Sequence, residues 1–297
     1  MDEQNTLILK AAISIAAKTG ANAVLIHADS LDDLLYAERI PKKLDIILLT
    51  RKKRVEPGDE EKNSLARRAR AVITLPRIAL TRIAIIKVGT TLALSQELLE
   101  PGARVVFAVG GPEGGGLDLI QSVDTSKESE IITGRGIMKI AEIVQPEIFQ
   151  SVLNLAIELA DKGREGKPVG TIFVVGDHEK VLQLSKQMIM NPFKGYDEDE
   201  RNVLHAGLKE TIREFSAMDG AFVIADDGTV LAAGRYLGAA IDESQLPRGL
   251  GSRHIAAAGI TTLTGALAFV ISESSGDVRI FKDGLIIMHL EKAPTKK

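Results

Sequence analysis

Apolar residues in the first part of the chain alternate between two kinds of spacing. Residues 5–21, NTLILKAAISIAAKTGA, place apolar side chains at helical intervals, and Gly20 marks the end of this predicted helix. Residues 23–28 and 43–50 are short continuous apolar runs, which are typical of buried strands. The alternation continues with a helix at 30–40, which has Ser30 as its N-cap. Further along, the stretches 64–76 and 91–102 alternate with predicted strands at 82–89 and 103–111. Strands separated by helices predict βαβ units, so we expect an α/β domain with a parallel sheet over residues 1–124.

The second part of the chain follows a polar stretch, interrupted by glycine, that predicts a linker over residues 125–138. Residues 139–297 are then expected to form one domain. Its predicted helices are 141–163, 179–186 and 197–218, the stretch 251–262 contains the first turn of a further helix, and its predicted strands lie within 170–177, 220–237 and 265–290. The sequences DDG, SSGD and KDG predict hairpin turns inside the last two of these stretches. The pattern therefore predicts a mixed-sheet α/β domain.

Composition narrows the class of protein. The chain has 297 residues, a net charge of -3 and a sequence pI of about 6.0, which argues against a broad nucleic-acid-binding face. It contains no cysteine, which excludes disulfides, thiolate catalysis and cysteine-based zinc sites. The first residues, MDEQNTLILK, do not resemble a signal peptide, and no apolar run approaches the ~20 residues of a membrane span. We therefore expect a cytoplasmic protein without a membrane partner.

Three short stretches of the second domain hold residues suited to phosphate chemistry: 219–221 (DGA), 251–254 (GSRH) and 272–273 (SE). Gly220 lets the backbone approach a bulky ligand closely. Glycine, serine and basic residues at a helix start place N–H donors and positive charge together, which suits phosphate. Asp219 and Glu273 offer hard oxygen ligands for Mg²⁺ or Mn²⁺. Singly, each stretch is more typical of a turn, a helix start or a solvated loop; together they predict a phosphoryl- or nucleotidyl-transfer site.

The order and separation of DGA, GSRHxAA and SExSG resemble the diadenylate cyclase family, also called the DAC or DisA_N domain, over residues 145–289. The resemblance implies a mixed sheet flanked by helices, and condensation of two ATP molecules into cyclic di-AMP with a divalent metal. It also implies that two protomers face each other, each with one ATP. It implies these roles: Asp219 beside the ribose 3′-hydroxyl and at the metal, Glu273 at the metal, Gly220 and Ala221 along the nucleotide, Tyr236 and Leu237 around adenine, Gly251, Ser252, Arg253 and His254 on the triphosphate, and Ser272 on phosphate.

One position departs from the family pattern. The family motif often has a basic residue where this chain has Ile255, so one positive charge near the phosphates is missing. Arg248 and Arg235 are the two candidates in the sequence for replacing that charge. The departure affects the expected rate and affinity more than the class of reaction.

The first domain resembles the C-terminal domain of pyruvate kinase, on the stretch GARVVFAVGGPEGGGLDLI at residues 102–120. Its glycine-rich loop, residues 110–116, has two interpretations: a phosphate cradle or a tight strand-to-helix turn, of which the turn is favoured. An α/β domain of this kind before a cyclase domain is similar to the archaeal-type diadenylate cyclases.

Three hypotheses follow. The leading one is a diadenylate cyclase that assembles with itself; the second is a sensor that binds ATP or cyclic di-AMP without turnover; the third is a scaffold whose first domain binds a metabolite or partner. The remaining histidines do not show a metal-binding spacing. The basic run at residues 51–62 is expected to be a solvated loop rather than a nucleic-acid contact.

Overall fold

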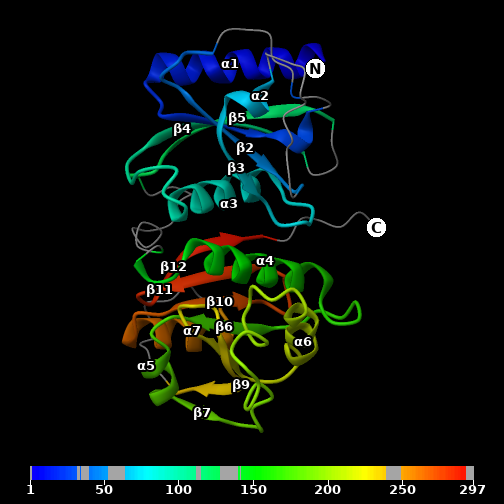
Figure 1. The fold of residues 1–297 in the computed structure, drawn as a ribbon, viewed down its shortest axis with the longest axis vertical. Helices are drawn as coiled ribbons and strands as arrows, with labels where there is room; N and C mark the ends of the chain where they lie inside the picture. The colour runs from blue at the N-terminus through cyan, green and yellow to red at the C-terminus, as the bar shows by residue number, and fades with distance from the viewer. Residues whose placement is uncertain are drawn as a thin grey trace. The chain divides into compact units, whose positions relative to one another are not determined.

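The computed structural model describes residues 2–31, 34, 40–52, 64–111, 115–127, 140, 142–238 and 249–291. The chain divides into two compact units, one up to Ile132 and one from Thr133 to Pro294 (Figure 1). Most of the expected linker, residues 128–138, lies outside the described residues. Within the described ranges, no helix is long and apolar enough to cross a membrane.

The first unit contains a five-stranded sheet in the order β3-β2-β1-β4-β5. Its elements are α1 (Glu3–Thr19), β1 (Ala23–His27), η1 (Ala28–Ser30), β2 (Asp45–Thr50), α2 (Leu65–Arg68), β3 (Ala69–Thr74), α3 (Arg82–Ser95), β4 (Arg104–Gly110) and β5 (Leu117–Asp124). The first four strands of the sheet pair in parallel, and β5 pairs antiparallel with β4. The expected parallel sheet is therefore present with one antiparallel edge strand.

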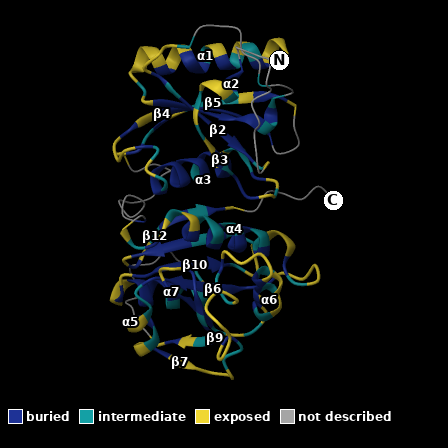
Figure 2. Ribbon diagram, viewed as in Figure 1, coloured by how far each residue is buried: buried dark blue, intermediate teal, exposed yellow. Residues whose placement is uncertain are grey.

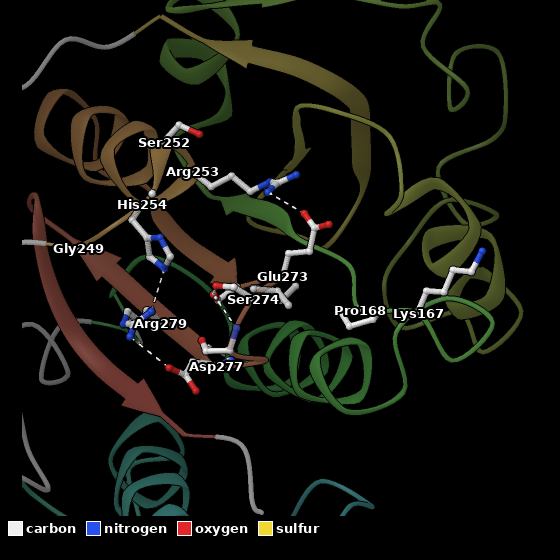
Figure 3. Close-up of a pocket in the computed structure, with 14 residues that line it drawn as sticks. Lys167, Pro168, Gly249, Ser252, Arg253, His254, Glu273, Ser274, Asp277 and Arg279 are labelled. Carbon is white, nitrogen blue, oxygen red and sulfur yellow. Dashed lines mark hydrogen bonds and ion pairs between the residues drawn. The ribbon is translucent and has the colours of Figure 1, made fainter. Parts of the chain in front are cut away.

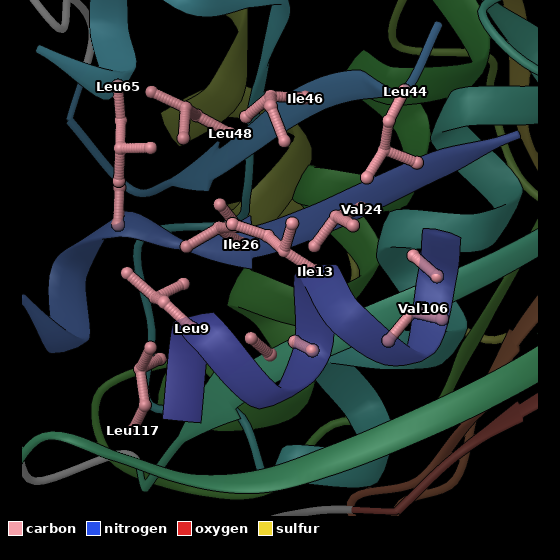
Figure 4. Close-up of a cluster of buried hydrophobic side chains, with 14 residues drawn as sticks. Leu9, Ile13, Val24, Ile26, Leu44, Ile46, Leu48, Leu65, Val106 and Leu117 are labelled. Atoms are coloured by element: carbon pink, nitrogen blue, oxygen red, sulfur yellow. The ribbon is translucent and has the colours of Figure 1, made fainter. Parts of the chain in front are cut away.

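Helices α1 and α3 cover opposite faces of this sheet (Figure 1). Leu9 and Ile13 of α1 pack with Val24 and Val106 in one buried cluster (Figure 4). On the other face, Gly89 of α3 lies close to Phe107 and Leu49. Neighbouring residues of a strand point to opposite faces, which is why adjacent positions of β4 meet different helices.

Two expectations for the first unit are wrong. Residues 82–89 were expected as a strand, but they form the first half of α3, whose N-cap Thr81 accepts from the amide of Ala84 at 3.1 Å. A short apolar run fits a buried helix as well as a buried strand, and α3 is buried around most of its circumference. The glycine-rich loop connects β4 to another strand rather than to a helix. The predicted helix at 30–40 and residues 112–114 of the loop fall mostly or wholly outside the described residues.

The second unit contains a seven-stranded mixed sheet in the order β12-β11-β10-β6-β8-β9-β7, in which only β6 and β8 pair in parallel. Its elements are α4 (Pro146–Lys162), β6 (Thr171–Val175), α5 (His178–Gln183), β7 (Ser185–Gln187), α6 (Leu208–Phe215), β8 (Ala221–Ile224), β9 (Val230–Leu237), α7 (Ser252–Leu263), β10 (Leu267–Ile271), β11 (Val278–Lys282) and β12 (Leu285–Leu290). The mixed sheet and the three hairpins predicted from DDG, SSGD and KDG are confirmed.

Helices α7 and α4 pack on the two faces of the second sheet, whose central strands are buried (Figure 2). Ala257 and Ala258 of α7 pack with Ala268 of β10 in one buried cluster. On the other face, Phe149 of α4 packs against Phe269, the next residue of β10, with the two rings tilted and their centroids 5.5 Å apart. Small side chains on α7 let the helix approach the sheet closely, which holds its first turn in a fixed position.

The helix expected at residues 197–218 begins only at Leu208. Before it, the chain bonds to the β8–β9 turn: the Val203 amide donates to the Gly228 carbonyl at 2.9 Å, and Asn202 Nδ2 donates to the Asp227 carbonyl at 2.9 Å. The Arg201 carbonyl also accepts from the Val230 amide at 2.8 Å, so tertiary bonds use backbone groups of Arg201 and Val203 that a helix would need. Likewise, the helix expected at 179–186 ends at Gln183 and is followed by β7.

Candidate functional site

Strand pairing brings three segments to one edge of the second sheet. Thr171, the first residue of β6, pairs with Ile271, the last residue of β10, and Ile172 pairs with Ala221 at the start of β8. Because β6 runs parallel to β8 and antiparallel to β10, the residues before β6, before β8 and after β10 meet at this edge. Helix α7 ends shortly before β10 begins at the opposite edge, so its first turn returns to the same place.

Arg253, in the first turn of α7, lies between two carboxylates at this edge. Its Nη2 is 3.8 Å from Asp219 Oδ1, and its Nη1 is 3.4 Å from Glu273 Oε2 (Figure 3 shows the Glu273 contact). The side chain of Asp219 is 93% exposed and that of Glu273 59% exposed, so solvent and ligands reach both. The structure thus brings together three of the residues singled out in the sequence, with the cation offsetting repulsion between the two anions.

Gly170, which the sequence reasoning did not single out, makes room for this pairing. A Cβ at this position would lie 2.7 Å from Arg253 Nη1 and 3.0 Å from Glu273 Cβ. Both distances are shorter than ordinary contacts, so any side chain here would displace the ion pair. The only signal in the sequence is a glycine directly before a buried strand, which is common elsewhere.

The start of α7 faces a cavity of about 890 Å³ (Figure 3). Gly251, Ser252, Arg253 and His254 line it from the helix, and Ser272 lines it from the loop after β10. The N-cap Gly251 has no side chain to bond the amides of the first turn. These amides and the positive end of the helix dipole suit an anionic ligand.

His254 is buried beside the cavity and belongs to a row of polar side chains. Arg279 Nη1 donates to His254 Nε2 at 3.0 Å, and Arg279 Nη2 donates to Asp277 Oδ2 at 3.2 Å. His289 Nε2 lies 3.1 Å from the same Asp277 oxygen. The sequence reasoning missed Arg279 and Asp277 as cavity residues and treated His289 as one of several scattered histidines. The signal available in the sequence was Arg279, a charged residue near the start of the predicted strand sequence VRIFK.

Burial, reinforced by the Arg279 cation, lowers the pKa of His254 from its ordinary 6.5 to about 4. We therefore expect His254 to be neutral at pH 7. Between pH 6.5 and 4 the unfolded chain would bind a proton that the folded chain does not, so stability should fall as the pH falls through this range, by roughly 3 kcal/mol in total. An NMR titration of the His254 ring, assigned with His254→Gln, should give a midpoint near 4; a midpoint near 6.5 would contradict the prediction.

Four of the predicted nucleotide-binding residues do not line the cavity: Gly220 directly precedes β8, Ala221 begins β8, and Tyr236 and Leu237 end β9. Gly220 has a φ of +102°, and a Cβ there would lie 2.7 Å from the Arg235 nitrogen, so its first requirement is packing against the backbone of β9. Ala221 is fully buried in β8. Tyr236 is 60% exposed on β9, whereas Leu237 is buried against the α7 side of the sheet. Their contacts with a nucleotide stay predictions.

Of the two arginines expected to replace the basic residue missing at Ile255, Arg235 does not line the cavity. Arg235 donates through Nη2 to the carbonyls of Leu182 and Ser185, both at 2.7 Å, and so ties β9 to the α5–β7 segment. Arg248 lies outside the described residues. Besides Arg253, the guanidinium of Arg279 lines the cavity beside His254.

The two carboxylates beside Arg253 can be compared with the ligands that a divalent metal ion needs. In the part of the chain that the structure describes, no group of three or more His, Asp or Glu side chains is placed to hold an ion. Asp219 and Glu273 supply two carboxylates, and Mg²⁺ at nucleotide sites commonly uses one or two carboxylates with substrate phosphates and water. The residues present therefore fit an ion that binds together with the nucleotide.

Both units of the chain match known protein families. Residues 158–286 match the family described as "DisA bacterial checkpoint controller nucleotide-binding", and residues 4–133 match the family described as "Probable sensor domain DacZ_P". A diadenylate cyclase from Methanocaldococcus jannaschii is 39% identical over 71% of this chain and 67% of its own length. A diadenylate cyclase from Haloferax volcanii is 36% identical over 69% of this chain and 74% of its own length. The structure of DacA from Staphylococcus aureus has a TM-score of 0.32 and 22% identity, over 47% of this chain and 84% of that chain.

The match at residues 4–133 concerns the first unit, whose likeness to the C-terminal domain of pyruvate kinase stays a prediction. The match at residues 158–286 spans every strand of the second sheet except the last residues of β12. With two curated relatives above 35% identity over two thirds or more of their lengths, the chain belongs to the diadenylate cyclase family of enzymes.

Proposed function

We propose that this enzyme condenses two ATP molecules into cyclic di-AMP and releases two pyrophosphates. The observation that carries the proposal is the meeting of Asp219 and Glu273 at Arg253, beside the uncapped start of α7 and a cavity of about 890 Å³. Membership of the diadenylate cyclase family supports the same reaction. Such a reaction needs positioning and charge neutralisation more than a protein nucleophile.

In each half of the reaction, the 3′-hydroxyl of one ATP attacks the α-phosphorus of the other. A new P–O bond forms as the bond from that phosphorus to the pyrophosphate oxygen breaks. We assign Asp219 to the attacking hydroxyl, whose proton its carboxylate accepts. A divalent ion, Mn²⁺ or Mg²⁺, held by Asp219 and Glu273 would neutralise phosphate charge when bound.

The triphosphate is assigned to the start of α7. Backbone amides at Gly251 and Ser252 and the guanidinium of Arg253 bind phosphate oxygens there, and Ser272 donates from the opposite loop. His254 contributes a further donor. A planar guanidinium with several donors suits the transition state, in which charge spreads over the equatorial phosphate oxygens.

The active species is proposed to be a face-to-face dimer of cyclase units. A cyclic dinucleotide requires two hydroxyls and two α-phosphates, whereas the chain has one DGA and one GSRH stretch. A two-fold pair would present each ATP to the other, and two-fold dimers are the commonest homo-oligomers. The exposure of Asp219, 93% of its side chain, suits a group that acts on a nucleotide bound between two protomers.

The direct test is to incubate the purified protein with ATP and Mn²⁺ and to search for cyclic di-AMP by mass spectrometry. Formation of cyclic di-AMP and pyrophosphate is expected. Binding of ATP without any product would instead favour a nucleotide sensor. Absence of both binding and product would favour the scaffold hypothesis and would refute the proposed function.

Dilution tests the two-pocket mechanism. If contact between cyclase units is weak, the specific activity should fall as the enzyme concentration falls. If the first unit holds protomers together, the fall should appear only in a fragment that starts near residue 136, because the first unit raises the effective concentration of the second pocket. Full activity of a fragment shown to be monomeric by light scattering under assay conditions would rule out the mechanism.

A further inference from the structure

The row of polar side chains behind the cavity comes from helix α7, strands β11 and β12 and the turn before β11. Arg279 of β11 is opposite His289 of β12 in the sheet register, and Asp277 precedes β11. The side chains of Arg279 and Asp277 are only 17% and 14% exposed. Arg279 reaches from this row to His254, as Figure 3 shows. These are contacts between side chains, in addition to the backbone pairing of the strands.

The contact with Arg279 determines which nitrogen of His254 carries the proton. A guanidinium has donors but no acceptor, so Nε2 of His254 must accept, and the proton of the neutral imidazole is then on Nδ1. Burial and the Arg279 cation keep the ring neutral by lowering its pKa to about 4. The row therefore selects a single tautomer.

The Nδ1 atom is the unusual part of this arrangement. It is buried, as is His254 as a whole, which is 6% exposed. It has no hydrogen-bond partner among the described residues. A buried N–H without an acceptor is costly. His254 lines the cavity, so we take the missing acceptor to be an atom of a ligand bound there, which the ring meets when the ligand binds.

We propose that Arg279 is a positioning residue that holds His254 as the Nδ1–H tautomer, so that Nδ1 donates to a phosphate oxygen of the bound nucleotide. Asp277 holds Arg279 from the other side, and His289 contacts the same carboxylate. The positive charge of Arg279 is already paired with the Asp277 carboxylate. Arg279 is therefore assigned to hold His254 and not to bind phosphate itself. The proposal rests on the proposed function, because it takes the ligand to be a nucleoside triphosphate.

The tautomer can be observed directly by ¹⁵N–¹H NMR of the histidine rings in the full chain. The wild type should show His254 protonated at Nδ1, and Arg279→Lys, which retains a donor, should show the same. Arg279→Met should shift His254 toward the Nε2–H form or a mixture. Protonation at Nε2 in the wild type, or an unchanged tautomer in Arg279→Met, would overturn the proposal.

Binding of 3′-deoxy-ATP with Mg²⁺, measured by calorimetry, provides a readout that does not need turnover. Arg279→Met should weaken binding about tenfold, the scale of one hydrogen bond to a charged oxygen, with Arg279→Lys closer to the wild type. Arg213→Met, which removes an arginine paired with Glu210 on α6, is the control and should bind like the wild type. If the wild type binds 3′-deoxy-ATP but makes no cyclic di-AMP from ATP, the proposed function fails, whereas the role of Arg279 in binding is still tested.

Two replacements of His254 distinguish the roles of its Nδ1 and Nε2 atoms. The amide nitrogen of Asn in His254→Asn can take the place of Nδ1, whereas that of Gln in His254→Gln reaches toward Nε2. His254→Asn should therefore bind the analogue more tightly than His254→Gln. In the His254→Asn background, Arg279→Met should weaken binding by much less than tenfold, because no tautomer remains to be set. An equal loss in both backgrounds would show that Arg279 acts on the nucleotide directly and would overturn the positioning role.

Discussion

Replacing Asp219 with Asn is expected to lower the rate of cyclic di-AMP formation by about 10²- to 10⁴-fold, the usual contribution of a general base. Asn keeps the shape of the side chain but cannot accept the hydroxyl proton or bind a divalent ion well. Because the Asp219 side chain is 93% exposed and its polar contact is a 3.8 Å approach to Arg253, the fold should be unaffected. The rate is measured as cyclic di-AMP by mass spectrometry, and ATP binding by calorimetry should survive at least in part.

The matched control is Asp226→Asn, an equally small change at a 68% exposed aspartate in the turn after β8. It should leave the rate near that of the wild type. Near-normal turnover of Asp219→Asn would refute the role assigned to this carboxylate. A loss of ATP binding as large as the loss of rate would show that Asp219 acts in binding instead.

The second large effect is expected from Arg253→Ala. The variant should bind ATP about ten- to a hundredfold more weakly, since a hydrogen bond to a charged group is worth roughly 1.5–3 kcal/mol. It also leaves Asp219 and Glu273 without the cation between them, and their charges would then repel the phosphates. Titration calorimetry with ATP, followed by rate measurements at saturating ATP, separates the loss of affinity from the loss of rate.

Arg253→Lys keeps the charge but loses the planar fork, so it should recover part of the affinity. Arg213→Ala, at an arginine on α6 that pairs with Glu210, should change neither affinity nor rate. Unchanged ATP affinity and rate in Arg253→Ala would count against the phosphate site at the start of α7.

Features set by neighbouring residues could be predicted from the sequence. The start of α7 follows from a glycine and a serine before a run of alanines, and α7 begins at Ser252 as expected. The hairpins follow from turn sequences that require only a few consecutive residues. Asp219, Arg253 and Glu273 could be grouped because each belongs to a short stretch with recognisable chemistry, and the structure brings them together.

Features set by distant residues could not be predicted. The segment before α6 looks helical, but its backbone bonds to the β8–β9 turn, more than twenty residues further along the chain. The apolar run at 82–89 gives no periodicity that would separate a buried helix from a strand. Arg279 meets His254 only because β11 pairs next to β10 and α7 covers both, and Gly170 matters only because Arg253 passes over it.

The alignment of strands at one edge of the second sheet limits how the enzyme could be re-engineered. Asp219 precedes Ala221 by two residues, and Glu273 follows Ile271 by two, so each carboxylate is tied closely to a paired position in a buried strand. A shift of β8 or β10 by one residue would turn its side chains to the opposite face, and a shift by two would move a carboxylate by about 6.6 Å. Strand register can therefore change the backbone separation of the two acids only in large discrete steps, so a ligand of slightly different size must be accommodated by rotation of the exposed side chains.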